Sequence, residues 1–322
     1  MAETRIDFQG FHWLDVSNPS PERLEQLAQT YNLHPTSVQD CLQPEHLPKY
    51  ELIEDVSFVV LRTYDPDAPA DADSVQDLTR KVAIFFSQKF VLSIHRKDQG
   101  LIQDLMERWS KKSQNASSPE HVLADLMNGV LRSYERPVLE CLNELELFET
   151  EIFGAGRSRK FRLSKGYYLK RKTSVFKRML RATTEPVNRT MAGADIELSP
   201  QFQDAKDVID NLSFYSDEVL ENINSLLNLF VSLASQRTNE ASHKTNEVMR
   251  VLTIFSCFFL PINFIASIYG MNFANLPETH WEYGYFYALG LMASVSLGIF
   301  IWFRRRGWLS GAKRRVKSSA TI

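Results

Sequence analysis

The 322-residue chain holds 37 lysines and arginines against 39 aspartates and glutamates, so no overall positive field favours nucleic acid. Its three cysteines, Cys41, Cys141 and Cys257, are scattered without CxxC spacing, which argues against a disulfide framework and a structural zinc site. The charged stretch 1–10 has no apolar core, and no signal peptide is expected.

The first third of the chain predicts a cytosolic α/β domain over residues 1–118. Proline-led amphipathic segments predict helices at 21–30 and 35–42, and a proline-rich stretch follows at 43–49. Runs rich in β-branched and aromatic residues predict strands at 10–16, 56–64, 78–87 and 89–95.

The pattern then becomes helical, and residues 119–198 predict a helical hairpin. Its first helix is expected over 119–153, with Pro137 as a kink. A basic helix is expected over 163–184.

A longer helix follows, whose cytosolic part is predicted over 199–248. Apolar residues recur there in steps of three and four, a seam typical of helix packing, at Val208, Leu212, Tyr215, Val219, Ile223, Leu226, Phe230 and Leu233. Neither glycine nor proline occurs between Pro200 and Pro261, so one helix is expected to continue into a membrane and to pack against copies of itself. The near repeat of seven residues at 235–248 lengthens this helix without rotating its faces.

Two apolar segments predict transmembrane helices at 249–270 and 284–303. Each has about 20 residues, the length that crosses the hydrocarbon core of a bilayer. The aromatic residues Trp281, Tyr283, Tyr285 and Trp302 lie at their ends, as in interfacial aromatic belts. The alternative is a pair of buried core helices in a soluble protein.

The charges around these segments predict the topology. The tail 304–322 is basic and Lys244 precedes the first span, whereas the loop 271–283 has no lysine or arginine. By the positive-inside rule both termini are cytosolic and the loop is extracytoplasmic, which places the chain in the cell membrane as a multi-pass protein. Glu278 and Glu282 in the loop would concentrate cations outside.

The first span carries polar residues at one-face spacing. Asn263 lies at membrane depth, where an amide must face protein or water. It either helps to line a water path or joins helices by hydrogen bonds. A chain with two spans needs several copies to enclose a path. Uncharged oxygens would hold an ion such as Mg²⁺ through its water shell, and Met249 and Leu252 would form an apolar constriction.

The segment Tyr269-Gly-Met-Asn-Phe273, followed by Leu276-Pro-Glu278, resembles the signature of CorA-type magnesium/cobalt transporters. The resemblance extends over 245–253 and 260–266, and Gln43–Glu51 occupies the place of a proline-lysine element of that family. It implies a funnel-shaped homopentamer with one long pore helix per subunit and Gly270, Met271 and Asn272 as selectivity filter. The positions that match pore-facing residues are Asn246, Met249, Leu252, Ser256, Leu260 and Asn263, the last in place of a common threonine.

The resemblance also suggests a regulatory cytosolic Mg²⁺ site. Asp204 and Asp207 look like its helical half, and Asp40, Glu54 and Asp55 are candidates for the partner carboxylate. A solvated helix face is the alternative interpretation of the two aspartates.

The predicted function is a passive divalent-cation channel driven by membrane potential, moving Mg²⁺ and also Co²⁺ inward and gated by cytosolic Mg²⁺. The alternatives are a Zn²⁺, Ni²⁺ or Co²⁺ transporter of the same family and a non-conducting membrane-anchored assembly protein. The chain shows no P-loop, GxSxG or HExxH motif, so no enzyme activity and no organic cofactor are expected. The expected partners are other copies of the chain, the lipid bilayer and divalent cations, without nucleic acid.

Overall fold

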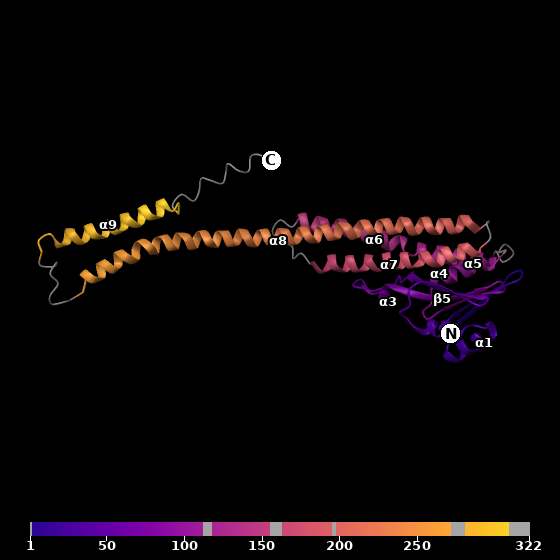
Figure 1. Ribbon diagram of the computed structural model, residues 1–322. Helices are drawn as coiled ribbons and strands as arrows, with labels where there is room; N and C mark the ends of the chain where they lie inside the picture. The colour runs from indigo at the N-terminus through magenta and orange to yellow at the C-terminus, as the bar shows by residue number, and fades with distance from the viewer. Residues whose placement is uncertain (1, 112–117, 155–162, 195–197, 272–280, 309–322) are drawn as a thin grey trace. The chain divides into compact units, whose positions relative to one another are not determined.

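The computed structural model describes residues 2–111, 118–154, 163–194, 198–271 and 281–308. The chain divides into two compact units, residues 1–231 and 232–322, and each is described by itself. Figure 1 labels most of their helices and the strand β5. The predicted domain limits at 118, 198 and 248 stay predictions.

The first unit is built on a six-stranded sheet in the order β1-β2-β6-β5-β4-β3. β2 and β6 are parallel, and every other neighbouring pair is antiparallel. The strands are β1 (Ala2–Asp7), β2 (His12–Ser17), β3 (Lys49–Ile53), β4 (Val56–Tyr64), β5 (Thr79–Ser87) and β6 (Phe90–His95).

The four predicted strands are confirmed within two residues at each end, as β2, β4, β5 and β6. The edge strands β1 and β3 were not predicted, because an edge strand faces solvent along one side and shows a weaker apolar pattern.

One face of the sheet is covered by α1 (Pro21–Tyr31) and α2 (Pro35–Leu42), which confirm the two predicted helices. Ser20 caps α1 through its Oγ, which accepts a bond from the Arg23 amide, and Pro21 occupies the first turn. Alternate strand residues face these helices and form one apolar core with them, including Val16, Phe58, Phe85, Leu92, Leu24 and Leu27.

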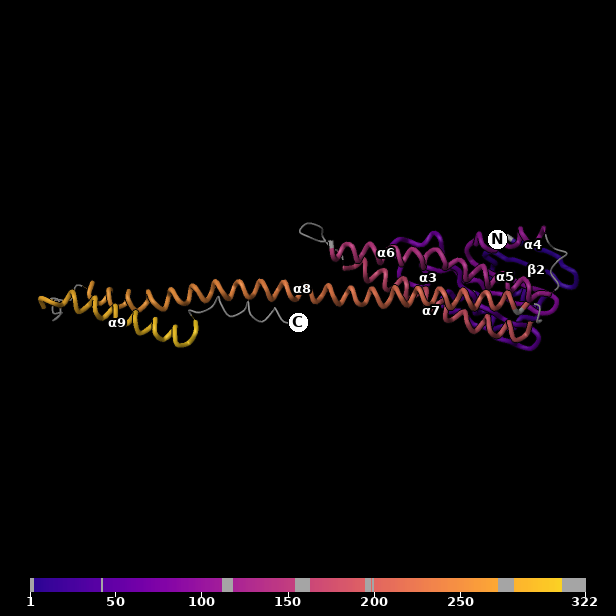
Figure 2. Tube along the Cα trace, turned by 90° about the horizontal axis from the view of Figure 1, so that it is seen from above, coloured from indigo at the N-terminus to yellow at the C-terminus, as the bar shows by residue number. Residues whose placement is uncertain are grey.

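The other face carries a helical layer (Figure 1). Its helices are α4 (Gly100–Lys111), α5 (Pro119–Arg132), α6 (Glu135–Gly154), α7 (Leu163–Gly193) and the start of α8 (Ser199–Tyr269), and the short α3 (Val75–Leu78) precedes β5. Figures 1 and 2 both show α6 and α7 side by side.

The prediction of a single kinked helix over 119–153 is wrong. The chain leaves the helix at Ser133 and Tyr134, and α6 starts at Glu135. Pro137 therefore lies in the first turn of α6, where a missing amide hydrogen costs little. The Tyr134 side chain is fully buried at this break and donates a hydrogen bond of 2.8 Å to the carbonyl oxygen of Arg62.

Two further helices differ from their predictions. α7 continues to Gly193, beyond the predicted end at Thr184, with Pro186 buried inside it. In α8, Leu212, Val219, Ile223 and Leu226 of the predicted seam are buried within the first unit itself. These residues are therefore not available to other copies of the chain, contrary to expectation.

Candidate functional site

The second unit contains two helices long and apolar enough to cross a membrane, the C-terminal part of α8 and α9 (Gly284–Arg305). Their most apolar stretches are 0% and 6% buried within the structure. A core helix of a soluble protein would be mostly buried, so this exposure contradicts the alternative of two core helices.

α9 covers one side of α8. The rings of Phe258 on α8 and Phe303 on α9 lie 6.0 Å apart, and Phe303 is buried. With about 100° of rotation per residue, the half-buried Ile254, Pro261 and Ile265 share the side of Phe258. This side of α8 therefore faces the partner helix of its own chain.

The predicted pore-facing residues lie on the other side of α8. The same rotation places them within about a third of the helix circumference, roughly opposite Phe258. All six are exposed, and they are Asn246, Met249, Leu252, Ser256, Leu260 and Asn263. Thr253 and Ser267, also exposed, lie in the same sector. The structure thus brings the polar residues of this span onto one stripe, which the described residues of its own chain leave uncovered.

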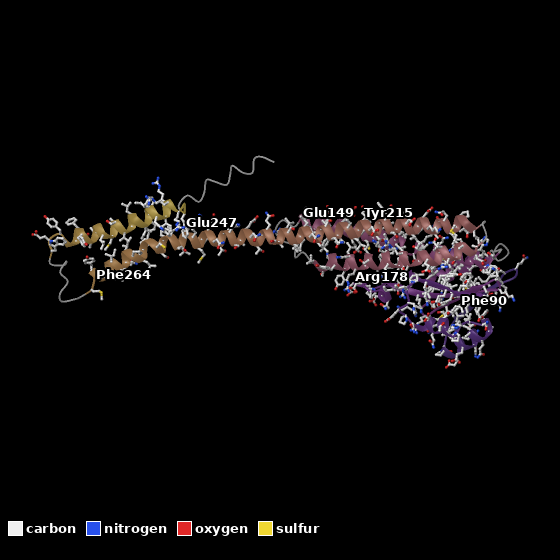
Figure 3. The ribbon with its side chains drawn as sticks, viewed as in Figure 1. Phe90, Glu149, Arg178, Tyr215, Glu247 and Phe264 are labelled. Atoms are coloured by element: carbon white, nitrogen blue, oxygen red, sulfur yellow. The ribbon has the colours of Figure 1, made fainter. Side chains whose placement is uncertain are left out.

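Figure 3 shows the side chains of this unit, with Glu247 and Phe264 labelled on α8. Glu247 lies beside Asn246, before the apolar stretch, and Phe264 follows Asn263 within it. Phe264 is 68% exposed, so a large apolar surface flanks the polar stripe. Such a surface suits contact with lipid or with another helix.

α8 ends immediately before the predicted filter. The amide of Gly270 donates to the carbonyl of Ala266 at 3.0 Å, and the amide of Met271 donates to Ile268 at 3.2 Å. A Cβ at position 270 would come within 3.3 Å of the Ala266 carbonyl oxygen, so a side chain there would press on the last helical turn. Asn272 and Glu278 lie outside the described residues, and Glu282 is exposed shortly before α9.

The far end of α9 is basic. Arg304 and Arg305 occupy its last turn, where positive charge complements the helix dipole. The guanidinium of Arg306 lies 5.7 Å from the ring centre of Trp302. An aromatic residue beside arginines is typical of the membrane–water interface.

Asp204 and Asp207, the predicted regulatory carboxylates, are both exposed on α8 in the first unit. An Asp204 Oδ2 atom lies 3.1 Å from Nη2 of Arg132 on α5, and Asp207 Oδ1 accepts a 2.9 Å bond from Gln203. Arg132 was not predicted, because it is separated from Asp204 by 72 positions and no local pattern links them.

The candidate partner carboxylates are not brought to these aspartates by any described contact. Asp40 is bound by Lys49 at 2.5 Å and by His46 at 3.1 Å. Burial acts to raise the pKa of Asp40, but the Lys49 bond and charge outweigh it, so the pKa is lowered. Glu54 and Asp55 are exposed between β3 and β4, and no described group of three acidic, histidine or cysteine side chains could hold a metal.

Known proteins resemble this chain over almost its whole length. A putative metal ion transporter of Bacillus subtilis, YfjQ, is 28% identical over 93% of this chain and 90% of its own. The cobalt/magnesium transport protein CorA of Thermotoga maritima is 25% identical over 95% and 83%. The solved structure of the CorA magnesium transporter from Methanocaldococcus jannaschii has the same fold, with a TM-score of 0.62 at 24% identity, covering 94% of this chain and 93% of that one.

The family model described as CorA-like Mg²⁺ transporter protein matches residues 8–305. An N-terminal α/β unit, a long helix and two apolar C-terminal helices, with the uncovered polar stripe on the first of them, agree with that match. The chain belongs to the CorA-like family of divalent-cation transporters of membranes.

Proposed function

We propose that this chain is the subunit of a passive channel that admits Mg²⁺, and also Co²⁺, into the cell. The relatives in Thermotoga maritima and Methanocaldococcus jannaschii are named for magnesium or cobalt/magnesium transport. Moving a divalent ion inward across a membrane potential of 100 mV releases about 4.6 kcal/mol of free energy. This is enough for roughly 2,000-fold accumulation without another energy source.

The uncovered polar stripe on α8 carries this proposal. Asn263 and Ser256 are exposed on the side opposite α9, although amides and hydroxyls are costly in hydrocarbon unless they meet protein or water. Two spans cannot enclose water, so several copies must place their stripes around a common axis. The family resemblance supports a homopentamer with both termini in the cytosol.

The chemistry of the stripe suits a hydrated ion. Mg²⁺ releases its waters reluctantly, and the stripe offers hydroxyl and amide oxygens without a carboxylate. Such groups accept hydrogen bonds from bound water and let the ion leave again. Gly270, Met271 and Asn272 would form the outer filter, Glu278 and Glu282 would attract cations, and Met249 with Leu252 would form an apolar gate.

Replacing the polar filter residue Asn272 tests the proposed function directly. Purified full-length protein in liposomes should take up Mg²⁺ when a negative internal potential is applied, and Co²⁺ should compete more strongly than Zn²⁺ or Ni²⁺. Asn272→Ala should abolish the uptake, whereas Asn275→Ala in the same loop should retain it. Equal uptake by the wild type and Asn272→Ala would remove the filter assignment.

A second test concerns the polar stripe on α8. Asn263→Leu should reduce uptake at least about tenfold, the effect of roughly 1.4 kcal/mol on a barrier. Ser294→Ala changes a side chain of α9 that bonds its own helix at Gly290 and should leave uptake unchanged. Unimpaired uptake by Asn263→Leu would show that the amide only joins helices.

Closure by cytosolic Mg²⁺ is proposed to act through Asp204 and Asp207. The ion would have to displace Arg132 from Asp204, since a carboxylate oxygen now lies 3.1 Å from that guanidinium. Asp204→Asn should therefore make the current less sensitive to internal Mg²⁺, whereas Asp210→Asn, an exposed residue on the same helix, should not. Identical sensitivity in the wild type and Asp204→Asn would place regulation elsewhere.

A further inference from the structure

A cavity of about 380 Å³ lies in the first unit, at the end of the sheet where the parallel strands β2 and β6 finish. The start of α1 and the loop after α2 complete its walls, with Leu24 and Ile94 among the apolar lining. Every charged residue that lines it is basic: Arg62, Arg80, Lys81, Arg96 and Lys97, with His95 beside them. No aspartate or glutamate contributes to the lining among the described residues.

Two of these cations are directly opposed. Arg62 on β4 and Lys81 on β5 are paired in the antiparallel register. Because strand side chains alternate, both lie on the face that carries Phe58 and Phe85, beneath α1 and α2. Like charges directly opposite each other destabilise a sheet, so this pair has a cost that the fold alone does not explain.

Neither cation bonds a carboxylate among the described contacts. Arg62 is 2% exposed, and its five described bonds go to neutral oxygens, such as Thr79 Oγ1 at 2.7 Å and the Pro44 carbonyl at 2.8 Å. Lys81 donates to the carbonyl oxygens of Asp40, at 2.5 Å, and Gln43. Burial lowers the pKa of Arg62 and, aided by the Arg62 charge, lowers the pKa of Lys81 to about 8.

The nearby carboxylates serve other cations. Nη2 of Arg80 lies 2.6 Å from both Asp65 and Asp67, and Lys97 at the mouth lies 3.6 Å from Asp65. Arg62 and Lys81 therefore give the cavity wall positive charge that no described carboxylate pairs.

We propose that this cavity binds a polyphosphate-bearing small molecule of nucleotide size. Its volume falls within the range of small-molecule sites, and a lining with several cations and no described carboxylate suits a multiply charged anion better than a singly charged one. The third ammonium hydrogen of Lys81 and the exposed Arg96 and Lys97 would donate to phosphate oxygens. The amino end of α1 adds favourable potential, and Arg62 acts through its charge.

The site lies wholly in the first unit and does not depend on the proposed ion path. Binding of radiolabelled ATP to the full-length protein in detergent is measured by equilibrium dialysis in Mg²⁺-free buffer. We expect saturable binding in the range up to about 1 mM, at least about tenfold tighter than that of AMP. Unlabelled tripolyphosphate distinguishes the sources: if it displaces ATP, the phosphate chain suffices, and if it does not, the nucleoside is also required.

Both double variants change exposed residues, so that folding is retained. Arg96→Ala with Lys97→Ala should weaken ATP binding at least about tenfold, the loss of roughly one charge-assisted bond. Lys89→Ala with Lys111→Ala removes the same charge from exposed positions outside the cavity and should change binding less than about twofold. ATP should also raise the melting temperature of the wild type more than that of Lys81→Met. Absence of saturable ATP and tripolyphosphate binding, or equal weakening in both double variants, would overturn the proposal.

Discussion

Replacing Lys81 with methionine tests whether the partly buried positive charge of this lysine destabilises the folded sheet. The pKa of Lys81 falls from 10.5 to about 8, first through burial and then through the charge of Arg62. Between these values the unfolded chain binds more protons than the folded one, so stability rises with pH from about 8 to about 10.5. In Lys81→Met this rise should be absent.

The size of this rise in the free energy of unfolding follows from the same pKa shift of Lys81. A change of about 2.5 pKa units corresponds to about 3.4 kcal/mol, and because Lys81 is only half-buried we reduce this to about 1.5–2 kcal/mol. Lys81→Met removes the cost of the charge but also loses the bonds to the carbonyls of Asp40 and Gln43. The lost bonds lower the stability of the variant by the same amount at both pH values, so their effect cancels when the two pH values are compared. For a unit of this size, about 2–4 °C accompanies each kcal/mol.

Melting temperatures of full-length wild type and Lys81→Met, measured in detergent at pH 7 and pH 10, give the comparison. The wild type should gain about 3–8 °C relative to the variant between these pH values. Lys89→Met, an exposed lysine in the turn between β5 and β6, serves as the control and should follow the wild type. Parallel curves for the wild type and Lys81→Met would refute the reasoning.

Two other changes probe the first unit. His95 is buried, and its Nε2 lies 3.1 Å from Asp15. Burial lowers the pKa of His95, but the hydrogen bond and the charge of Asp15 raise it by more, so the net pKa is raised. The stabilisation is present below pH 6.5 and is lost as the pH rises through the raised value, so the melting temperature of the wild type should fall relative to His95→Gln from pH 6 to pH 8. Gly166→Ala would place a Cβ 2.6 Å from Cζ of Phe148 and should cost about 1–3 kcal/mol, read as a lower melting temperature.

Each of these has a discriminating control. Replacement of the exposed His34 by glutamine should leave the pH dependence unchanged, and a wild-type curve parallel to that of His95→Gln would refute the role of the ion pair. Adding Phe148→Leu to Gly166→Ala should recover part of the loss if the contact is the cause. Additive effects of the two substitutions would show that it is not.

The sequence by itself determined the elements whose environment is uniform along the chain. Both membrane helices follow from composition, because a bilayer requires an apolar run of fixed length. The strands β4, β5 and β6 are buried on both faces and show it as nearly unbroken apolar runs. The polar stripe on α8 follows from helical spacing alone, since one helix turn separates its members.

The tertiary structure decided what depends on which segments meet. The edge strands β1 and β3 form only because a neighbour is present to pair with them. Arg132 reaches Asp204 through the packing of α5 and α8, and Arg62 opposes Lys81 through the register of β4 and β5. Composition and spacing describe each segment separately, whereas charge pairing is a property of two segments in contact, and that contact is set by the burial of their apolar residues.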